Sequence, residues 1–202
     1  MERRGRDWCA PVVLLAAALA TGLAAAGCGS SSASSGLSLS ATTDVRAMAA
    51  LVGAGQVPTY RAVYTVTGPG GATGTLVVNQ RPPQASYAQG GTTVRVSADS
   101  PHASELAGVV VSRPVLLGVV EHDGQLIEEG NPGGALATVA RVHRTLGGQS
   151  STCLTVTGAV GRHVICTTPD GIPTEVVLSG THAVLVSLSS TVDVGELAPP
   201  AG

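Results

Sequence analysis

Residues 151–168 have the sequence STCLTVTGAVGRHVICTT and predict two antiparallel strands joined by a tight turn. Cys153 and Cys166 are equally far in sequence from Gly158 and Gly161. A hairpin that pairs the two glycines therefore places the two cysteines directly opposite each other. The register gives a non-hydrogen-bonded pair, with Cα atoms roughly 4.5 Å apart, which is within the reach of a disulfide. Such a disulfide should stabilise the fold by roughly 3 kcal/mol.

Two alternatives remain open for this hairpin. Ala159-Val160 suits a two-residue turn of type I′ poorly, so the loop can be longer. The two cysteines can also remain free buried thiols. An exported protein in an oxidising compartment favours the disulfide.

The two-residue period of this hairpin recurs on both sides of it. Apolar and polar residues alternate in short segments that end at glycine or proline. The segments are residues 60–67, 75–79, 85–89 and 93–97, and then 172–178 and 183–194. Short strands joined by tight turns predict an antiparallel meander with one apolar face.

Two helices are expected to accompany these strands. Residues 42–44 offer N-caps to a helix over residues 45–52, which ends at Gly53. Asn131-Pro132 predicts the start of a second helix, ending at Gly147-Gly148. The apolar face of this second helix would consist of Leu136, Val139, Ala140 and Leu146.

The segment between the meander and the second helix predicts strands. Residues 109–120 are strongly apolar but interrupted at Pro114, so we expect two short strands with the proline at an edge or bend. Residues 121–124 are expected to form a turn. The fold class that follows is α+β.

The N-terminus predicts export. A basic segment at residues 1–8 precedes the uncharged, apolar residues 11–26, which are short for a bilayer span of roughly 20 residues. We therefore expect a signal peptide over residues 1–27, a flexible Ser/Gly-rich tether over residues 28–40 and a single domain over residues 41–202.

Residues 23–28, Leu-Ala-Ala-Ala-Gly-Cys, resemble a bacterial lipoprotein lipobox. The resemblance implies that Cys28 carries a diacylglyceryl group, with acyl chains such as palmitate, and becomes the first residue of the mature chain. Two acyl chains form a stable anchor, so the expected location is the extracytoplasmic face of the cell membrane. The alternatives are a secreted protein without lipid and an uncleaved anchor.

The composition argues against a nucleic-acid partner, since the net charge is −2 and no basic patch occurs. No nucleophile, phosphate-binding or zinc motif occurs either, so we expect no enzyme, no metal and no cofactor. His102 with Glu105, and residues 121–123, are expected to be solvated surface rather than metal ligands. His143, His163 and His182 are expected to be surface or strand-edge residues without partners.

The opening helix followed by four further segments resembles an uncharacterised group of actinobacterial lipoproteins. The segments are residues 60–64, 77–83, 166–173 and 197–200. The group is similar in layout to the LolA-like and LppX/LprG-like lipoprotein carriers. The resemblance implies a strongly curved antiparallel sheet, an unclosed half-barrel, with two or so helices across its concave side. It also implies an apolar cavity between them that holds acyl chains, and no catalytic residues.

The residues expected to line this cavity are Tyr60, Tyr64, Val66, Leu76, Val78, Tyr87, Val94, Val96, Leu136 and Val139. For the tyrosines, the alternative is a packed core in which each hydroxyl is hydrogen-bonded. The expected function is to bind or carry a lipidic or other hydrophobic ligand. The alternative is a structural or interaction lipoprotein of the cell envelope that has no ligand cavity, and its partner protein stays open.

Overall fold

The computed structural model describes residues 37, 39–54, 58–80, 84–97, 111–159 and 161–192. All of these belong to one compact unit, residues 34–202. The predictions for the signal peptide, Cys28, the pair His102 and Glu105, and residues 197–200 lie outside the described residues.

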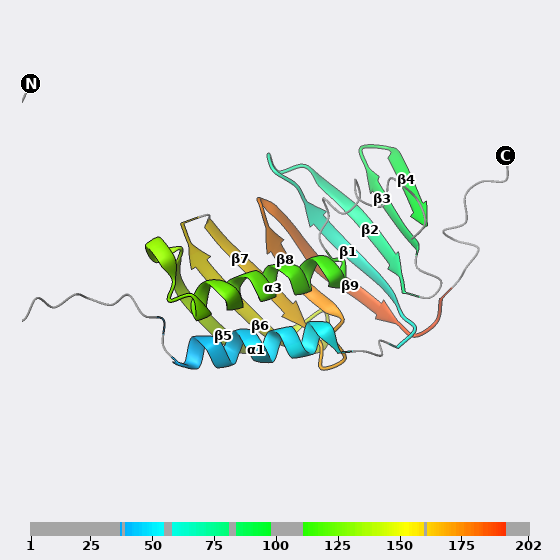
Figure 1. Ribbon diagram of the computed structural model, residues 1–202. Coiled ribbons are helices and arrows are strands. Elements are labelled where there is room, and N and C mark those ends of the chain that lie inside the picture. The colour runs from blue at the N-terminus through cyan, green and yellow to red at the C-terminus, as the bar shows by residue number, and fades with distance from the viewer. Residues whose placement is uncertain are drawn as a thin grey trace, which may run out of the picture. The chain divides into compact units, whose positions relative to one another are not determined.

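Nine strands form one open antiparallel sheet in the order β4-β3-β2-β1-β9-β8-β7-β6-β5 (Figure 1). The strands are β1 Arg61–Thr67, β2 Thr73–Asn79, β3 Gln84–Gln89, β4 Thr92–Ser97, β5 Leu136–Leu146, β6 Gln149–Gly158, β7 Gly161–Thr167, β8 Pro173–Leu178 and β9 Thr181–Ser189. The predicted meander of four strands over residues 60–97 is confirmed, as is the strand at residues 172–178. The strand predicted at residues 183–194 is confirmed as β9 but ends at Ser189, and residues 193–194 lie outside the described residues.

The register predicted for the β6–β7 hairpin is confirmed. Gly158 pairs with Gly161, and Cys153 pairs with Cys166. The two cysteines form a disulfide, and their Cα atoms are 3.9 Å apart. Both are fully buried in a small cluster with Val164, separate from the main core. Leu154, the neighbour of Cys153 in the strand, belongs to the main core. Because successive side chains of a strand point to opposite faces, the disulfide lies on the other face of the sheet and cross-links the hairpin there.

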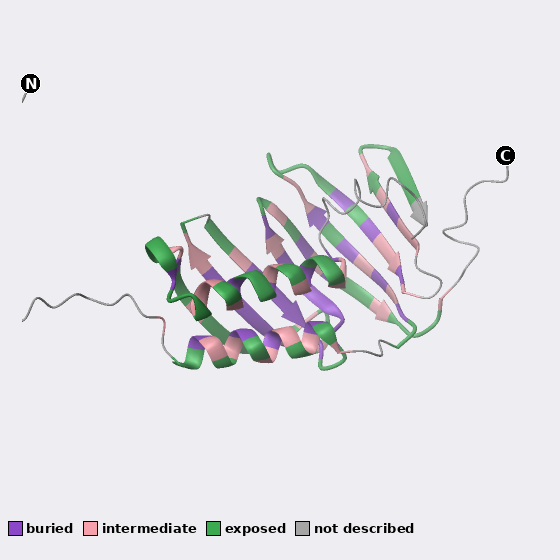
Figure 2. Ribbon diagram, viewed as in Figure 1, coloured by how far each residue is buried: buried purple, intermediate pink, exposed green. Residues whose placement is uncertain are grey.

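Helices α1, Leu39–Gly53, and α3, Arg113–Glu128, lie side by side across one face of the sheet (Figure 1). The buried residues of the sheet lie beneath and beside them (Figure 2). The predicted first helix is confirmed but begins earlier, within the range expected for the tether. Its buried face consists of Ala41, Val45, Met48 and Val52.

The strands predicted within residues 109–120 and the turn predicted at residues 121–124 are wrong where the structure describes them, because residues 111 and 112 form no strand and the chain forms α3 from Arg113 onward. Residues 109 and 110 lie outside the described residues. Pro114 lies in the first turn of the helix, where a proline interrupts no hydrogen bond. The buried face consists of Leu116, Val120 and Asp123, at helical spacing. A polar residue on the buried face concealed the helical period.

The second helix predicted over residues 131–146 is also wrong. Only the short 3₁₀ turn η1, Pro132–Gly134, follows Asn131, and the chain then enters β5. Asn131 has a φ of 56°, and its side chain exchanges two hydrogen bonds of 2.7 Å with the backbone of Leu136. The asparagine therefore stabilises the start of a strand instead of capping a helix.

Arg113 connects the two helices. Its guanidinium donates hydrogen bonds to the carbonyl oxygens of Val52, at 2.9 Å from Nε, and of Ala54. The last carbonyls of a helix lack partners within it, and a cation there also favours the helix dipole. Arg141 of β5 forms an ion pair of 2.9 Å with Asp44 of α1. These contacts hold the helix pair on the sheet.

The turn between β7 and β8 gives a test of the helix packing. Gly171 has a φ of 74°, and a Cβ at this position would collide with the carbonyl oxygen of Leu51 in α1. Gly180 has a similar φ of 80° but only ordinary contacts. Gly180→Ala should therefore lower the free energy of unfolding, measured in urea, by about 1–2 kcal/mol because of its backbone conformation alone. Gly171→Ala should lower it by about 1–3 kcal/mol more, because α1 must also shift. Equal losses would contradict the close contact.

Candidate functional site

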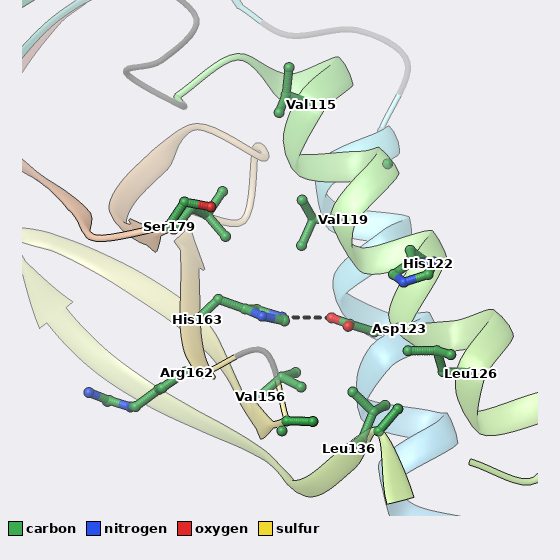
Figure 3. A pocket seen from close by; sticks show the side chains of 16 residues that line it. Val115, Val119, His122, Asp123, Leu126, Leu136, Val156, Arg162, His163 and Ser179 are labelled. Atoms are coloured by element: carbon green, nitrogen blue, oxygen red, sulfur yellow. Dashed lines mark hydrogen bonds and ion pairs between the residues drawn. The ribbon is translucent and has the colours of Figure 1, made fainter. Parts of the chain in front are cut away.

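A cavity of about 590 Å³ lies between α3 and the sheet, next to the β6–β7 hairpin (Figure 3). Its apolar walls are formed by Val115, Val119, Leu126, Leu136, Val156 and Leu178. Pockets for small ligands typically have volumes of about 300–1,000 Å³ and mostly apolar walls with a few polar groups. The volume and lining of this cavity therefore suit a small apolar or amphiphilic ligand.

Asp123 and His163 meet inside the cavity (Figure 3). Nε2 of His163 lies 2.7 Å from Oδ2 of Asp123, and the two side chains are only 14% and 4% exposed. Since an ionised carboxylate only accepts hydrogen bonds, Nε2 is the donor. The contact joins α3 to β7, and it supplies the partner that a buried carboxylate needs.

This contact corrects two predictions. His163 is expected to lack a partner and Asp123 to be solvated, whereas the structure buries Asp123 and pairs it with the partly buried His163. Part of the signal was present in the sequence: the hairpin register places His163 opposite Val156, on the core-facing side of the sheet. The helix that carries Asp123 was missed, so its partner could not be inferred.

The remaining polar groups of the cavity lie at its edge. His122 and Arg162 are exposed, and Figure 3 shows the Arg162 side chain extending away from the space between Asp123 and His163. Ser179 has a φ of 48° and Gly180 a φ of 80°. Leu178 pairs with Thr181, so Ser179 and Gly180 form a two-residue hairpin turn between them. A turn of this kind requires positive φ at both of its positions. The turn accounts for the conformation of Ser179.

The residues predicted to line a cavity lie in several environments. Leu136 lines the cavity described above. Tyr60, Tyr64, Val66 and Leu76 are buried in the main core, and Val78, Tyr87 and Val139 are partly buried against it. Val94 is 45% exposed, and the side chain of Val96 lies outside what the structure describes. The hydroxyl of Tyr64 donates a hydrogen bond of 2.9 Å to the carbonyl oxygen of Pro173.

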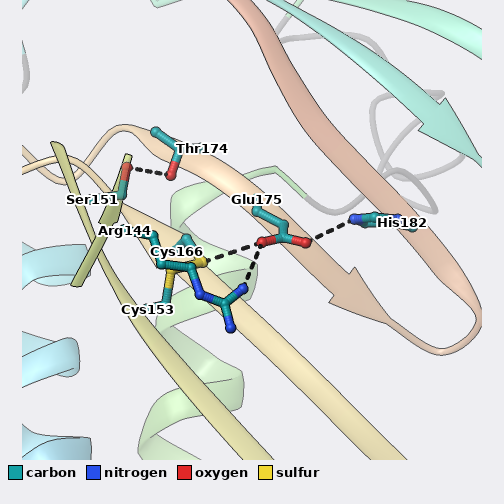
Figure 4. Close-up of polar contacts among 7 residues, drawn as sticks. All are labelled: Arg144, Ser151, Cys153, Cys166, Thr174, Glu175 and His182. Atoms are coloured by element: carbon teal, nitrogen blue, oxygen red, sulfur yellow. Dashed lines mark hydrogen bonds and ion pairs between the residues drawn. A yellow bond between two sulfur atoms is a disulfide. The ribbon is translucent and has the colours of Figure 1, made fainter. Parts of the chain in front are cut away.

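A second polar cluster lies beside the disulfide (Figure 4). Glu175 accepts a hydrogen bond of 3.0 Å from Nε2 of His182, and Nη1 of Arg144 is 3.8 Å from its other oxygen. His143 also has a partner, the hydroxyl of Thr152 at 3.1 Å. The prediction that these histidines lack partners is therefore wrong. Among the described residues, no group of three or more His, Cys, Asp or Glu side chains could hold a metal.

No protein-family model matches the chain, and no curated protein matches it either. Among solved structures, the chain is similar to MucB, with 11% sequence identity and a TM-score of 0.40 over 81% of this chain and 64% of MucB. It is also similar to a DUF1329 family protein from Desulfovibrio piger, with 12% identity and a TM-score of 0.23 over 74% of this chain and 90% of that one. The chain thus spans less than two thirds of MucB, and both scores are too low to assign a family.

Within the part of the chain that the structure describes, neither helix combines the length and the apolar character that crossing a membrane requires.

Two buried tyrosines predict a loss of stability at alkaline pH. Burial raises the pKa of Tyr60, although the charge of Arg113 lowers it in part. Burial raises the pKa of Tyr64 well above its usual value, and Tyr60 adds to this effect. The folded state favours the neutral form of both phenols, because their pKa values are raised there. Their contribution to the stability of the fold is therefore complete below pH about 10, and it is lost as the pH rises above that value.

The expected result is that absorbance at 295 nm, which reports tyrosinate, rises together with the loss of the circular dichroism signal. Tyr64→Phe should lose about 1 kcal/mol at pH 7 with its hydrogen bond. The same variant should show a shallower decline of stability above pH 10. Ordinary titration of Tyr60 and Tyr64 in a folded protein would contradict this assignment.

Proposed function

We propose that this chain is a membrane-anchored extracytoplasmic lipoprotein that binds an apolar ligand between α3 and the sheet. The observation that supports this proposal is the apolar cavity. Its walls are aliphatic, and His122 and His163 supply the only rings among its described lining residues. An alkyl or acyl chain suits such walls better than an aromatic ligand, which gains from stacking on other rings.

Binding would be driven by removing apolar surface from water. Val115 is 39% exposed at the cavity, whereas Leu136 and Val156 form buried parts of its wall. Each methylene group of a ligand that becomes buried contributes about 0.8 kcal/mol. An alkyl chain of several carbons therefore gains enough free energy to bind without any charged contact.

The proposed anchor places this cavity where such ligands occur. A diacylglyceryl group on Cys28 would hold the chain at the membrane, and the Ser/Gly-rich residues that follow would act as a flexible tether. In this proposal the helices occupy the concave side of the curved sheet, as in the lipoprotein carriers that the sequence resembles. The protein would take up an apolar ligand at the membrane surface and shelter it from water.

Gly118 provides a test of the cavity. It lines the cavity, and a Cβ at this position would meet no atom within 4 Å. Gly118→Leu should therefore fill space that the ligand uses. If about two methylene groups of the ligand can no longer be buried, binding weakens about tenfold.

The measurement is saturable labelling of the full chain, held in amphipol, by an alkyl diazirine probe. Mass spectrometry identifies the labelled peptides. In the wild type, labelling is expected in α3 and in the β6–β7 hairpin.

Gln125→Leu is the matched control for this variant. It adds the same side chain to an exposed position of α3 that does not line the cavity, so labelling should stay unchanged. Gly118→Leu should not weaken the fold, since leucine favours a helix by up to about 1 kcal/mol over glycine. An unlabelled wild type, or equal labelling of the two variants, would exclude ligand binding in this cavity and leave an interaction role in the envelope.

The anchor is tested separately. Cys28→Ser removes the thiol that would carry the diacylglyceryl group, so incorporation of radioactive palmitate should be lost. Cys153→Ser should retain incorporation, because its sulfur is used in the disulfide. Membrane fractionation checks the location. Incorporation of palmitate into the Cys28→Ser protein would rule out Cys28 as the attachment site.

A further inference from the structure

We infer that the ligand has an uncharged, hydroxyl-bearing polar end, as an acylglycerol has, and that the Asp123–His163 pair selects it over a fatty acid of the same chain length. This inference rests on the proposed function, because it specifies the chemistry of a ligand in the same cavity. It starts from the presence of an ionisable pair in a cavity whose other walls are mainly aliphatic.

The charge of the pair disfavours an anionic ligand. When His163 is neutral, the pair has a formal charge of −1, and when His163 is protonated the charge is zero. The pair is never positive. Because the Asp123 side chain is only 4% exposed, water screens its charge poorly. A ligand carboxylate or phosphate beside it would therefore meet repulsion that an uncharged head avoids.

The hydrogen-bonding groups of the pair favour a hydroxyl. Nε2 of His163 is used by Oδ2 of Asp123. With neutral His163, the groups that remain are Nδ1 and the other carboxylate oxygen, which are both acceptors and require a donor. With protonated His163, Nδ1 becomes a donor and the carboxylate stays an acceptor. A hydroxyl group, which both donates and accepts, satisfies either state, whereas a carboxylate has no proton to offer Asp123.

The other charged groups of the cavity do not offset this preference. His122 and Arg162 are the remaining ionisable side chains among its described lining residues, and both are exposed to solvent. Figure 3 shows the Arg162 side chain directed away from the pair. Charges that are exposed in this way are screened by water and salt. The pair therefore determines the polarity of the interior of the cavity.

The test compares two competitors in the labelling assay on the full chain in amphipol. Monopalmitoylglycerol and palmitate, each below its micellar concentration, compete with the alkyl diazirine probe at pH 7.5. We expect half-maximal competition by monopalmitoylglycerol at a concentration at least tenfold lower. Asp123→Asn keeps the size of the side chain and removes its charge, so competition by palmitate should improve at least fivefold while that by monopalmitoylglycerol changes less than threefold.

Glu121→Gln is the matched control. It removes a carboxylate from an exposed position of α3 that does not line the cavity, so the ratio of the two competitors should stay as in the wild type. Circular dichroism checks that each variant folds. If Asp123→Asn does not fold, the wild-type ratio decides the inference.

The outcomes separate this inference from the proposed function. If both lipids compete equally in the wild type, or if Asp123→Asn folds and leaves the ratio unchanged, the selection by the pair is overturned while ligand binding stands. If neither lipid competes and the probe does not saturate, the proposed function itself fails. A preference for palmitate in the wild type would reverse the assigned polarity and overturn the inference.

Discussion

The fold depends on the antiparallel pairing of β1 with β9, two strands from opposite ends of the described chain. This pairing joins the meander β1–β4 to the strands β5–β9, so that nine strands form one sheet instead of two smaller ones. It aligns Tyr64 with Leu185 and Val66 with Ala183, all of which are buried. The hydroxyl of Tyr64 then reaches the carbonyl oxygen of Pro173 across β9. A single continuous core on one face of the sheet follows from this pairing.

The two faces of the β6–β7 hairpin make different contacts. On one face the disulfide between Cys153 and Cys166 holds the two strands together, and Glu175 lies beside it. On the other face His163 extends toward α3 and meets Asp123. The disulfide restricts the backbone of β6 and β7, so little conformational freedom is left to lose when His163 binds Asp123. The disulfide therefore helps to hold His163 at the position that its partner requires. The cavity is thus built on a rigid strand pair and one helix.

The sequence predicts those parts of the fold in which each strand buries one face and exposes the other. In β1 this alternation is strong, so the strand could be derived. The β6–β7 hairpin is buried on both faces, and there the register of the cysteines could be derived because Gly158 and Gly161 mark the turn. β5 is an edge strand whose residues are mostly exposed on both sides, so it shows no alternation, and its apolar residues happened to suit a helix. The position of the cavity depends on which strands α3 covers, and short-range patterns contain no such information. Of the predicted lining residues, Leu136 lies at this cavity.

The place where the helical pattern of α3 fails is also the place where its chemistry is unusual. A leucine at Asp123 would have completed the apolar stripe formed by Leu116 and Val120, and exchanging a buried ion pair for apolar residues is often neutral or stabilising. A buried carboxylate next to an open apolar cavity is therefore poorly explained by stability alone. Sequences depart from the pattern that their fold favours mainly at functional sites. The same residue that concealed the helix from sequence analysis thus distinguishes this cavity from an ordinary packing defect, because a packing defect requires no pair of hydrogen-bonded ionisable groups in its wall.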